Sequence, residues 1–213
     1  MKISILTDQK SWFNRYVDEL KHLLKERGHD VDIIHDAHNI TTGDVCFLLG
    51  VYSLVKQDIL SRNHHNLVIH ASDLPLGKGW APLAWQVLEG KNEIPVCLFE
   101  ATEQVDAGDI YVKSFIKLEG HELCDEIRFK QAQNMIELCF KFVDDYPQIL
   151  QRAISQTGEE TFYPRRTLDS SELDINKSIK EQFNLLRVVD NNDYPAFFYH
   201  EGYKYTLKIE KSK

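Results

Sequence analysis

Leu67-Val68-Ile69-His70-Ala71-Ser72-Asp73-Leu74-Pro75 is the stretch around which the rest of the chain is organised. The apolar run 67–69 predicts a buried strand. The glycines and prolines of 72–82 predict an ordered loop, and the apolar spacing of 83–89 predicts a helix after it. His70 therefore stands where a strand ends. In open α/β sheets, that edge is where ligands bind.

A second motif, Asp106-Ala107-Gly108-Asp109-Ile110, lies downstream of His70. Taken alone, this motif is typical of a surface turn, because Asp and Gly are turn residues. Taken alone, His70 is typical of a buried, hydrogen-bonded histidine. With the strand expected at 96–100 between them, the two motifs together indicate an imidazole oriented by a carboxylate. That arrangement is the minimum for general base catalysis.

The two motifs, with Lys78-Gly79 and Pro82 between them, resemble the folate-dependent formyltransferase family. The resemblance implies transfer of a formyl group from N10-formyltetrahydrofolate to an amine. It also implies that His70 is the general acid/base and that Asp106 tunes it. One position departs from the family pattern, which has Asn two residues before the His. Here that position is Val68, whose isopropyl group cannot donate a hydrogen bond.

Three interpretations of Val68 are open. His70, as an imidazolium paired with Asp106, stabilises the oxyanion itself. Alternatively, Asn66, which shares a strand face with Val68 and His70, reaches the site if the strand bends. In the third interpretation the chain is a noncatalytic folate- or nucleotide-binding protein.

The resemblance also assigns binding residues. The cofactor is expected to contact Ser53, Leu54, Val55, Lys56, Thr102, Glu103, Gln104 and Val105. The substrate is expected to contact Ser72, Lys78, Gly79, Trp80, Arg165 and Arg166. Without the resemblance, the cofactor stretches are typical of a helix start and an exposed loop. Lys78 then fits a solvated loop charge, Trp80 a packing residue, and the two arginines a surface basic pair. Lys78 replaces the family's common Arg, which keeps the charge but loses the bidentate fork.

The composition indicates a globular protein of 213 residues with a net charge of −8. The acidic balance does not favour nucleic-acid binding. No apolar run approaches the length of a membrane span or a signal peptide, so we expect no membrane association. The four cysteines are scattered, which predicts reduced thiols in the cytoplasm rather than disulfides, and we expect no bound metal.

The fold class expected is α/β, with a Rossmann-like, doubly wound and mostly parallel sheet. Strands are predicted at 2–7, 30–35, 45–50, 67–70, 96–100 and 110–117, and helices at 12–25, 54–60, 83–89 and 124–146. Residues 1–155 would form the catalytic domain. Residues 156–213 would form a C-terminal extension with a short helix near 179–190 and a β-hairpin made of 194–199 and 203–209.

The acceptor expected from the resemblance is a nucleotide-linked amino sugar, specifically a UDP-4-amino-4,6-dideoxy sugar used in surface polysaccharide biosynthesis. Residues 162–166 and the tail hairpin look more like the sugar enzymes than like glycinamide ribonucleotide formyltransferase. Within the sugar enzymes, the compact form and residues 68–75 suggest a pseudaminic-acid-type pathway. The chain stops short of the C-terminal domain with which a tRNA formyltransferase contacts tRNA. Glycinamide ribonucleotide formyl transfer and formyltetrahydrofolate hydrolysis are the enzymatic alternatives, and a homodimer is left open.

Overall fold

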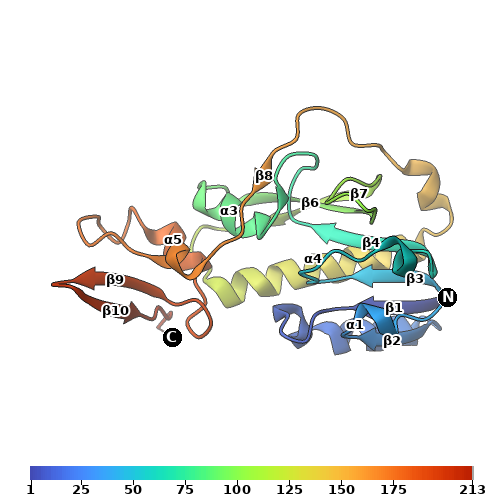
Figure 1. The fold of residues 1–213 in the computed structure, drawn as a ribbon, viewed down its shortest axis with the longest axis horizontal. Coiled ribbons are helices and arrows are strands. Elements are labelled where there is room, and N and C mark those ends of the chain that lie inside the picture. Colours follow the sequence, from blue (N-terminus) through green and yellow to red (C-terminus); the bar gives the residue numbers. More distant parts are fainter. Residues whose placement is uncertain (213) are drawn as a thin grey trace.

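A computed structural model describes residues 1–212 and places a six-stranded sheet at the centre of the molecule (Figure 1). Its strands are ordered β2 (Asp30–Ile34), β1 (Lys2–Leu6), β3 (Gly43–Leu48), β4 (Asn63–His70), β6 (Glu93–Glu100) and β7 (Ile110–Lys117). The pairs β1·β2, β1·β3 and β3·β4 are parallel, whereas β4·β6 and β6·β7 are antiparallel. Strands β2 and β3 lie on opposite sides of β1, so the strand order reverses there. This arrangement confirms the Rossmann-like fold.

The helices are α1 (Val17–Glu26), α2 (Gln57–Leu60), α3 (Pro82–Leu88), α4 (Cys124–Asp144) and α5 (Phe183–Val188). Short 3-10 helices occupy Trp12–Arg15, Ala37–Asn39, Gln148–Arg152 and Leu168–Ser171. Several sequence predictions differ in extent from the structure: β4 and β6 begin before the predicted 67–70 and 96–100, and α5 is shorter than the predicted 179–190. Two helices differ most clearly. The helix expected at 12–25 is interrupted at Tyr16, because Ser11 caps a separate 3-10 turn at Phe13. The helix expected at 54–60 begins only at Gln57, after an extended Lys56.

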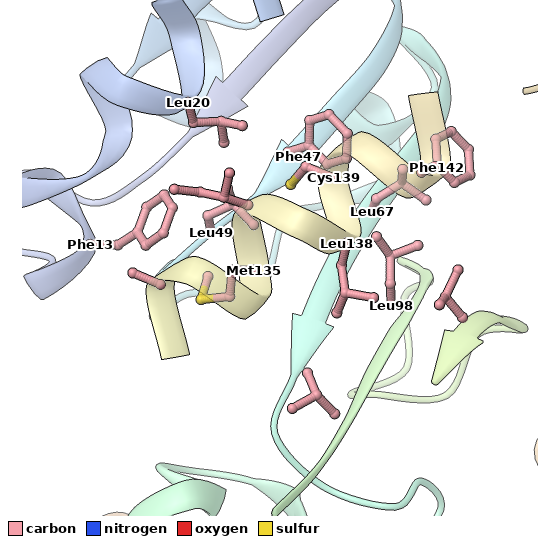
Figure 2. Close-up of a cluster of buried hydrophobic side chains, with 14 of the residues drawn as sticks. Phe13, Leu20, Phe47, Leu49, Leu67, Leu98, Met135, Leu138, Cys139 and Phe142 are labelled. Carbon is pink, nitrogen blue, oxygen red and sulfur yellow. The ribbon is translucent and has the colours of Figure 1, made fainter. Parts of the chain in front are cut away.

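The main core lies between the sheet and the long helix α4. Figure 2 shows Phe47, Leu67 and Leu98 of the sheet facing side chains of α4. The α4 side chains of this cluster include Met135, Leu138, Cys139 and Phe142. All are almost fully buried, and each large apolar side chain removed from water contributes about 1.5–3 kcal/mol. This face of the sheet holds the fold together.

The opposite face of the sheet carries a smaller apolar cluster and the candidate site. Successive side chains of a strand point to opposite faces. Along β4, Leu67 and Ile69 therefore pack in the main core, while Val68 packs against the smaller cluster around Leu48 and Ile59. His70 shares the face of Val68. The alternation of β4 thus places the histidine on the face that α4 does not cover.

The C-terminal extension is docked by charged contacts. The hairpin of β9 (Ala196–His200) and β10 (Tyr203–Leu207) confirms the expected one and projects from the end of the molecule (Figure 1). The buried Arg187 of α5 contacts Glu122, and Asp190 pairs with Arg128 of α4. Hydrogen bonds also cross the expected boundary at 155/156, since β5 (Lys78–Gly79) pairs with β8 (Phe162–Tyr163). The two-part division stays a prediction, and its last residue, Lys213, lies outside the described residues.

Within residues 1–212, no helix combines the length and the apolar character needed to cross a bilayer.

Candidate active site

His70 lies at the end of β4 with 8% of its surface exposed. Its Nε2 atom donates a hydrogen bond to the carbonyl oxygen of Gly77 at 2.9 Å. Its Nδ1 atom lies 3.8 Å from Oδ2 of Asp106. Both ring nitrogens therefore face oxygen acceptors. A neutral imidazole has one N–H, so it donates to one of these two oxygens at a time.

Asp106 is held in a tight turn beside that ring. Its φ of 49° lies in the left-handed region, which few residues other than Gly adopt. Its Oδ2 atom accepts a hydrogen bond from the backbone N–H of Gly79 at 2.9 Å. A Cβ on Gly108 would lie 1.7 Å from the carbonyl oxygen of Glu100, so only glycine fits there. The turn is therefore pressed against the end of β6, with its carboxylate beside His70.

The loop after His70 is held by side chains of α3 and β6. The Gln86 amide donates to the carbonyl oxygen of Ala71 at 2.6 Å. Cys97, which pairs with His70 in the sheet, donates through Sγ to the carbonyl oxygen of Ser72 at 3.2 Å. The Ser72 hydroxyl is buried and has no partner among the described side chains and backbone. Ser72 is one of the expected substrate contacts. Its hydroxyl has hydrogen-bonding capacity that the described chain does not use.

Two of the expected substrate residues are placed together at the surface. Trp80 is exposed, and its ring stacks on that of Tyr52 with a centroid distance of 6.4 Å. The guanidinium of Arg165 lies over the same indole, 4.7 Å from its centroid. The structure therefore builds an aromatic and cationic surface from three separate segments.

Lys78 and Arg166 are placed differently from the expectation. Lys78 is 1% exposed, and its ammonium pairs with Glu160 at 2.6 Å, so it is not a solvated charge. The guanidinium of Arg166 donates to the carbonyl oxygens of Val188 and Ser170. Burial lowers the pKa of Arg166 below its ordinary value. These contacts hold the tail against the site loop, and the substrate contacts expected of Lys78 and Arg166 stay predictions.

Gly79, the remaining expected substrate residue, is needed for backbone geometry. Its φ is 94°, and a Cβ there would lie 2.7 Å from the carbonyl oxygen of Tyr163. Its N–H donates a hydrogen bond to Oδ2 of Asp106. The structure thus gives Gly79 a place in the site through its backbone.

The structure also bears on the interpretations of Val68. Val68 packs against Leu74 and Phe99 as well as the cluster of Leu48. Asn66 is buried, and its amide donates to the carbonyl oxygen of Leu60 at 2.8 Å. That bond directs the only side-chain N–H groups of Asn66 toward α2. We therefore discard Asn66 as the replacement donor.

The two expected cofactor stretches lie on the same face of the sheet as Val68. Val55 of the first stretch and Ala101, next to the second, pack against the smaller apolar cluster with Val68. The other members of the stretches are exposed: Ser53, Leu54, Lys56, Thr102, Glu103, Gln104 and Val105. The structure thus brings the two stretches to one apolar surface.

A pocket of about 380 Å³ is lined by residues that adjoin one end of each of these stretches. Its lining includes Gln57, which follows Lys56, and Ala101, which precedes Thr102. The carboxylate of Glu100 lies in its wall and accepts hydrogen bonds from the Asn66 N–H at 2.6 Å and the Tyr111 hydroxyl at 2.9 Å. Burial and the nearby Glu100 raise the pKa of Tyr111 above its ordinary value. None of the eight expected cofactor residues is part of the lining.

Sequence reasoning missed three groups that touch the site. The carbonyl of Gly77 holds His70, and the hydroxyl of Thr161 accepts the Gly77 N–H at 2.8 Å. The amide of Gln156 contacts the Asp106 turn. These contacts join segments more than 40 residues apart or use backbone atoms, so no local pattern marks them.

Comparisons with known proteins find formyltransferases among the matches. No protein-family model matches the chain. It is 28% identical over 149 residues to methionyl-tRNA formyltransferase of Lactobacillus johnsonii, covering 68% of this chain and 46% of that protein. The chain thus spans about half the length of the curated relatives it matches.

Two solved structures share the fold. HypX from Aquifex aeolicus in complex with tetrahydrofolic acid has a TM-score of 0.83 at 19% identity, covering 98% of this chain and 37% of that one. A sugar N-formyltransferase from Shewanella has a TM-score of 0.71 at 13% identity, covering 100% and 99% of the two chains.

Proposed function

Because this chain belongs to the folate-dependent formyltransferase family, we propose that it transfers a formyl group from N10-formyltetrahydrofolate to the amine of a nucleotide-linked amino sugar. The observation that carries the proposal is the pair of His70 and Asp106, 3.8 Å apart at the end of β4. The whole-chain activity and its substrates are part of the proposal, since the match covers only 46% of the relative's length.

His70 is the residue that moves the proton. An amine attacks a formyl carbon only when it is neutral, so a base must remove its proton as the bond forms. Asp106 stabilises the imidazolium that results, because an opposite charge within about 4–6 Å favours the charged form. Nε2 is the ring atom that faces the loop. A substrate reaches it by replacing the carbonyl of Gly77 as hydrogen-bond partner.

The oxyanion needs a donor that Val68 does not provide. With Asn66 bonded to Leu60, the side-chain donor that remains for the oxyanion is the N–H that His70 gains when it takes the proton from the amine. Losing one oxyanion donor costs about 2.7–4 kcal/mol of barrier, which slows an enzyme without abolishing its activity. We therefore retain catalysis for this chain and keep the noncatalytic folate-binding protein, which Val68 favours, as the second candidate.

The formyl donor fits the face of the sheet that holds His70. The donor supplies the one-carbon group at N10 of a flat, largely apolar ring system. Val55, Val68 and Ala101 offer an apolar surface for it, beside a pocket whose size is within the usual range of about 300–1,000 Å³ for ligand sites. The exposed backbone of 53–56 and 102–105 offers polar groups at its edges.

The acceptor is assigned from the surface around Trp80. The stacked rings of Trp80 and Tyr52 suit a nucleoside base, and Arg165 suits a diphosphate, since a guanidinium matches phosphate geometry. The fold shared with a sugar N-formyltransferase also supports this acceptor class. The UDP-4-amino-4,6-dideoxy sugar is the specific acceptor we propose.

The test is a comparison of acceptors at saturating N10-formyltetrahydrofolate. The protein is incubated with the UDP-4-amino-4,6-dideoxy sugar, glycinamide ribonucleotide, methionyl-tRNA or no acceptor, and mass spectrometry follows the formylated product. Formylation of the amino sugar by the wild type, and its loss in His70→Asn, is the result we expect. Turnover with another acceptor replaces the proposed one, and loss of formyl without any acceptor indicates a hydrolase. Tight cofactor binding without turnover indicates the noncatalytic protein.

A further inference from the structure

Residues 154–163 form a strap that links the two site motifs. At one end, Ile154 exchanges two backbone hydrogen bonds with Ile110, of 2.8 and 2.9 Å, at the end of the Asp106 turn. At the other end, Tyr163 pairs with Gly79 of the loop after His70. In Figure 1 this segment arches above the sheet, from the 3-10 helix Gln148–Arg152 to the end of β8. It therefore links both site motifs to the start of the C-terminal extension.

Gln156 is a strap residue whose side chain contacts the backbone of the Asp106 turn. Its Nε2 atom donates to the carbonyl oxygens of Asp106 at 2.9 Å and Gly108 at 2.8 Å. Its Oε1 atom is buried and has no partner within residues 1–212. An unsatisfied buried acceptor costs stability. The side chain is thus held where both donors are used although its acceptor is not.

The opposite side of the turn has no room to move. The Cα of Gly108 lies so close to the carbonyl oxygen of Glu100 that a methyl group would not fit. Asp106 adopts its left-handed φ between these two contacts. The direction of its carboxylate toward His70 depends on that backbone, because the side chain has only two rotatable bonds. The Gln156 amide adds two hydrogen bonds that hold the carbonyl groups of this backbone.

We propose that Gln156 is a positioning residue, which keeps the Asp106 carboxylate beside Nδ1 of His70 by holding the carbonyls of Asp106 and Gly108. The geometric statement stands on the contacts of the described chain, and its kinetic consequence rests on the proposed function. Gln156 acts through Asp106 and touches no reacting atom.

Three variants isolate this role. Gln156→Glu keeps the shape of the side chain but replaces the donating NH2 with an oxygen that repels both carbonyls. Gln156→Ala removes the contacts without adding repulsion. It provides the test if the Glu variant does not fold. Ser155→Ala is the matched control, because Ser155 bonds the side chain of Asp109 in the same turn at 2.7 Å and is exposed.

The first measurement is the titration of the His70 imidazole followed by NMR, with the resonance assigned from a His70→Gln variant. The titration in Gln156→Ala and Gln156→Glu should move in the same direction as in Asp106→Asn, while Ser155→Ala leaves it unchanged. In the double variant Asp106→Asn/Gln156→Ala, the second change should add nothing, because it acts through a carboxylate that is already gone. If Gln156 only stabilised the fold, its substitution would lower the melting temperature without moving this titration.

The second measurement is formyl transfer at saturating cofactor. Misplacing a catalytic group by about 1 Å costs up to about 100-fold, so kcat of Gln156→Ala should fall by about 10- to 100-fold with little change in KM. A His70 titration identical to wild type in both Gln156 variants would overturn the inference. A wild type without turnover, whose titration nevertheless responds to Gln156, would overturn the proposed function and leave the inference standing.

Discussion

Two ion pairs in this molecule are built in opposite ways. Glu122 and Arg187, at the junction with the C-terminal extension, are 2% and 1% exposed. The Glu122 carboxylate also accepts hydrogen bonds from Lys130 at 2.6 Å and from the Glu119 N–H at 2.8 Å. His70 and Asp106 are less buried, 3.8 Å apart, and share their polar atoms with the backbone of Gly77 and Gly79.

The difference separates structure from chemistry. In the junction pair every strong acceptor of Glu122 is used by this chain, so no other molecule is needed to satisfy it. In the site pair the partners are loop backbone groups, which a substrate is able to replace. The junction should therefore respond to substitution in stability, and the site in activity.

The largest effect is expected for His70→Asn. Removing the general acid/base should lower formyl transfer by about 10²- to 10⁴-fold. The unfolding free energy should change little, because the site face contributes less apolar packing than the face under α4. Activity assays and thermal unfolding measure the two. Activity within threefold of wild type, in a folded variant, would remove His70 from the reaction.

Asp106→Asn should be almost as damaging to the rate. The amide keeps the shape and the contact with Gly79 but cannot stabilise an imidazolium. The limb of the kcat/KM profile that reports the basic group should move to lower pH. An unchanged rate and profile would leave Asp106 as a turn residue only. Asp109→Asn, in the same turn but bonded to Ser155, is the matched control.

Glu122→Gln should lower stability and spare the chemistry. The substitution leaves Arg187 and Lys130 facing a neutral group, and breaking one partner of a buried pair costs about 3–5 kcal/mol of unfolding free energy. Urea denaturation should show this loss, while kcat of the folded variant stays within twofold of wild type. Glu119→Gln, whose carboxylate is exposed, is the control. A rate loss as large as that of His70→Asn would contradict the separation of the two regions.

Acid should weaken the same junction. Burial opposes ionisation of Glu122, but Lys130 and the backbone N–H of Glu119 outweigh it and lower its pKa from 4.5 to about 2. Because the pKa is lowered in the folded state, the ionised carboxylate stabilises the fold above pH 4.5, and that stabilisation is lost as the pH falls toward about 2. Denaturation of wild type and Glu122→Gln across this range should give a difference that shrinks with falling pH. A constant difference would contradict it.

The smallest effect is expected for Val68→Asn. If His70 serves as the oxyanion donor, the added amide should change the rate only modestly in either direction. It also risks an unsatisfied polar group among Leu48, Leu74 and Phe99, at a cost of about 1–3 kcal/mol of stability. An inactive wild type that Val68→Asn restores to ordinary enzyme rates would show a degraded site instead.

The parts of the fold that periodicity encodes were predictable. A buried sheet covered by a helix is predicted by the apolar runs of β1, β3 and β4 and by the spacing of apolar residues in α4. The hairpin followed from two aromatic runs around Glu201-Gly202. The antiparallel direction of β6 has no local signal, because an apolar run reads the same in either direction.

The candidate site was predictable only where a motif names a side chain. His70 and Asp106 were found and do lie together. Lys78 reads as a loop charge until the tail, 82 residues later, brings Glu160 to it. Gln156 and Thr161 sit in a polar stretch without periodicity, and their partners are backbone atoms. Such contacts depend on the tertiary fold, which a single sequence does not display.

The most direct test of the central claim is the wild-type turnover itself. The protein is given N10-formyltetrahydrofolate and the UDP-4-amino-4,6-dideoxy sugar, and the formylated sugar and tetrahydrofolate are quantified together, with His70→Asn measured in parallel. We expect the two products in equal amounts from the wild type and at least about 100-fold less from the variant. Equal rates from both proteins, or tetrahydrofolate formed without formylated acceptor, would contradict the account of His70 and Asp106 as the centre of an amino-sugar formyltransferase.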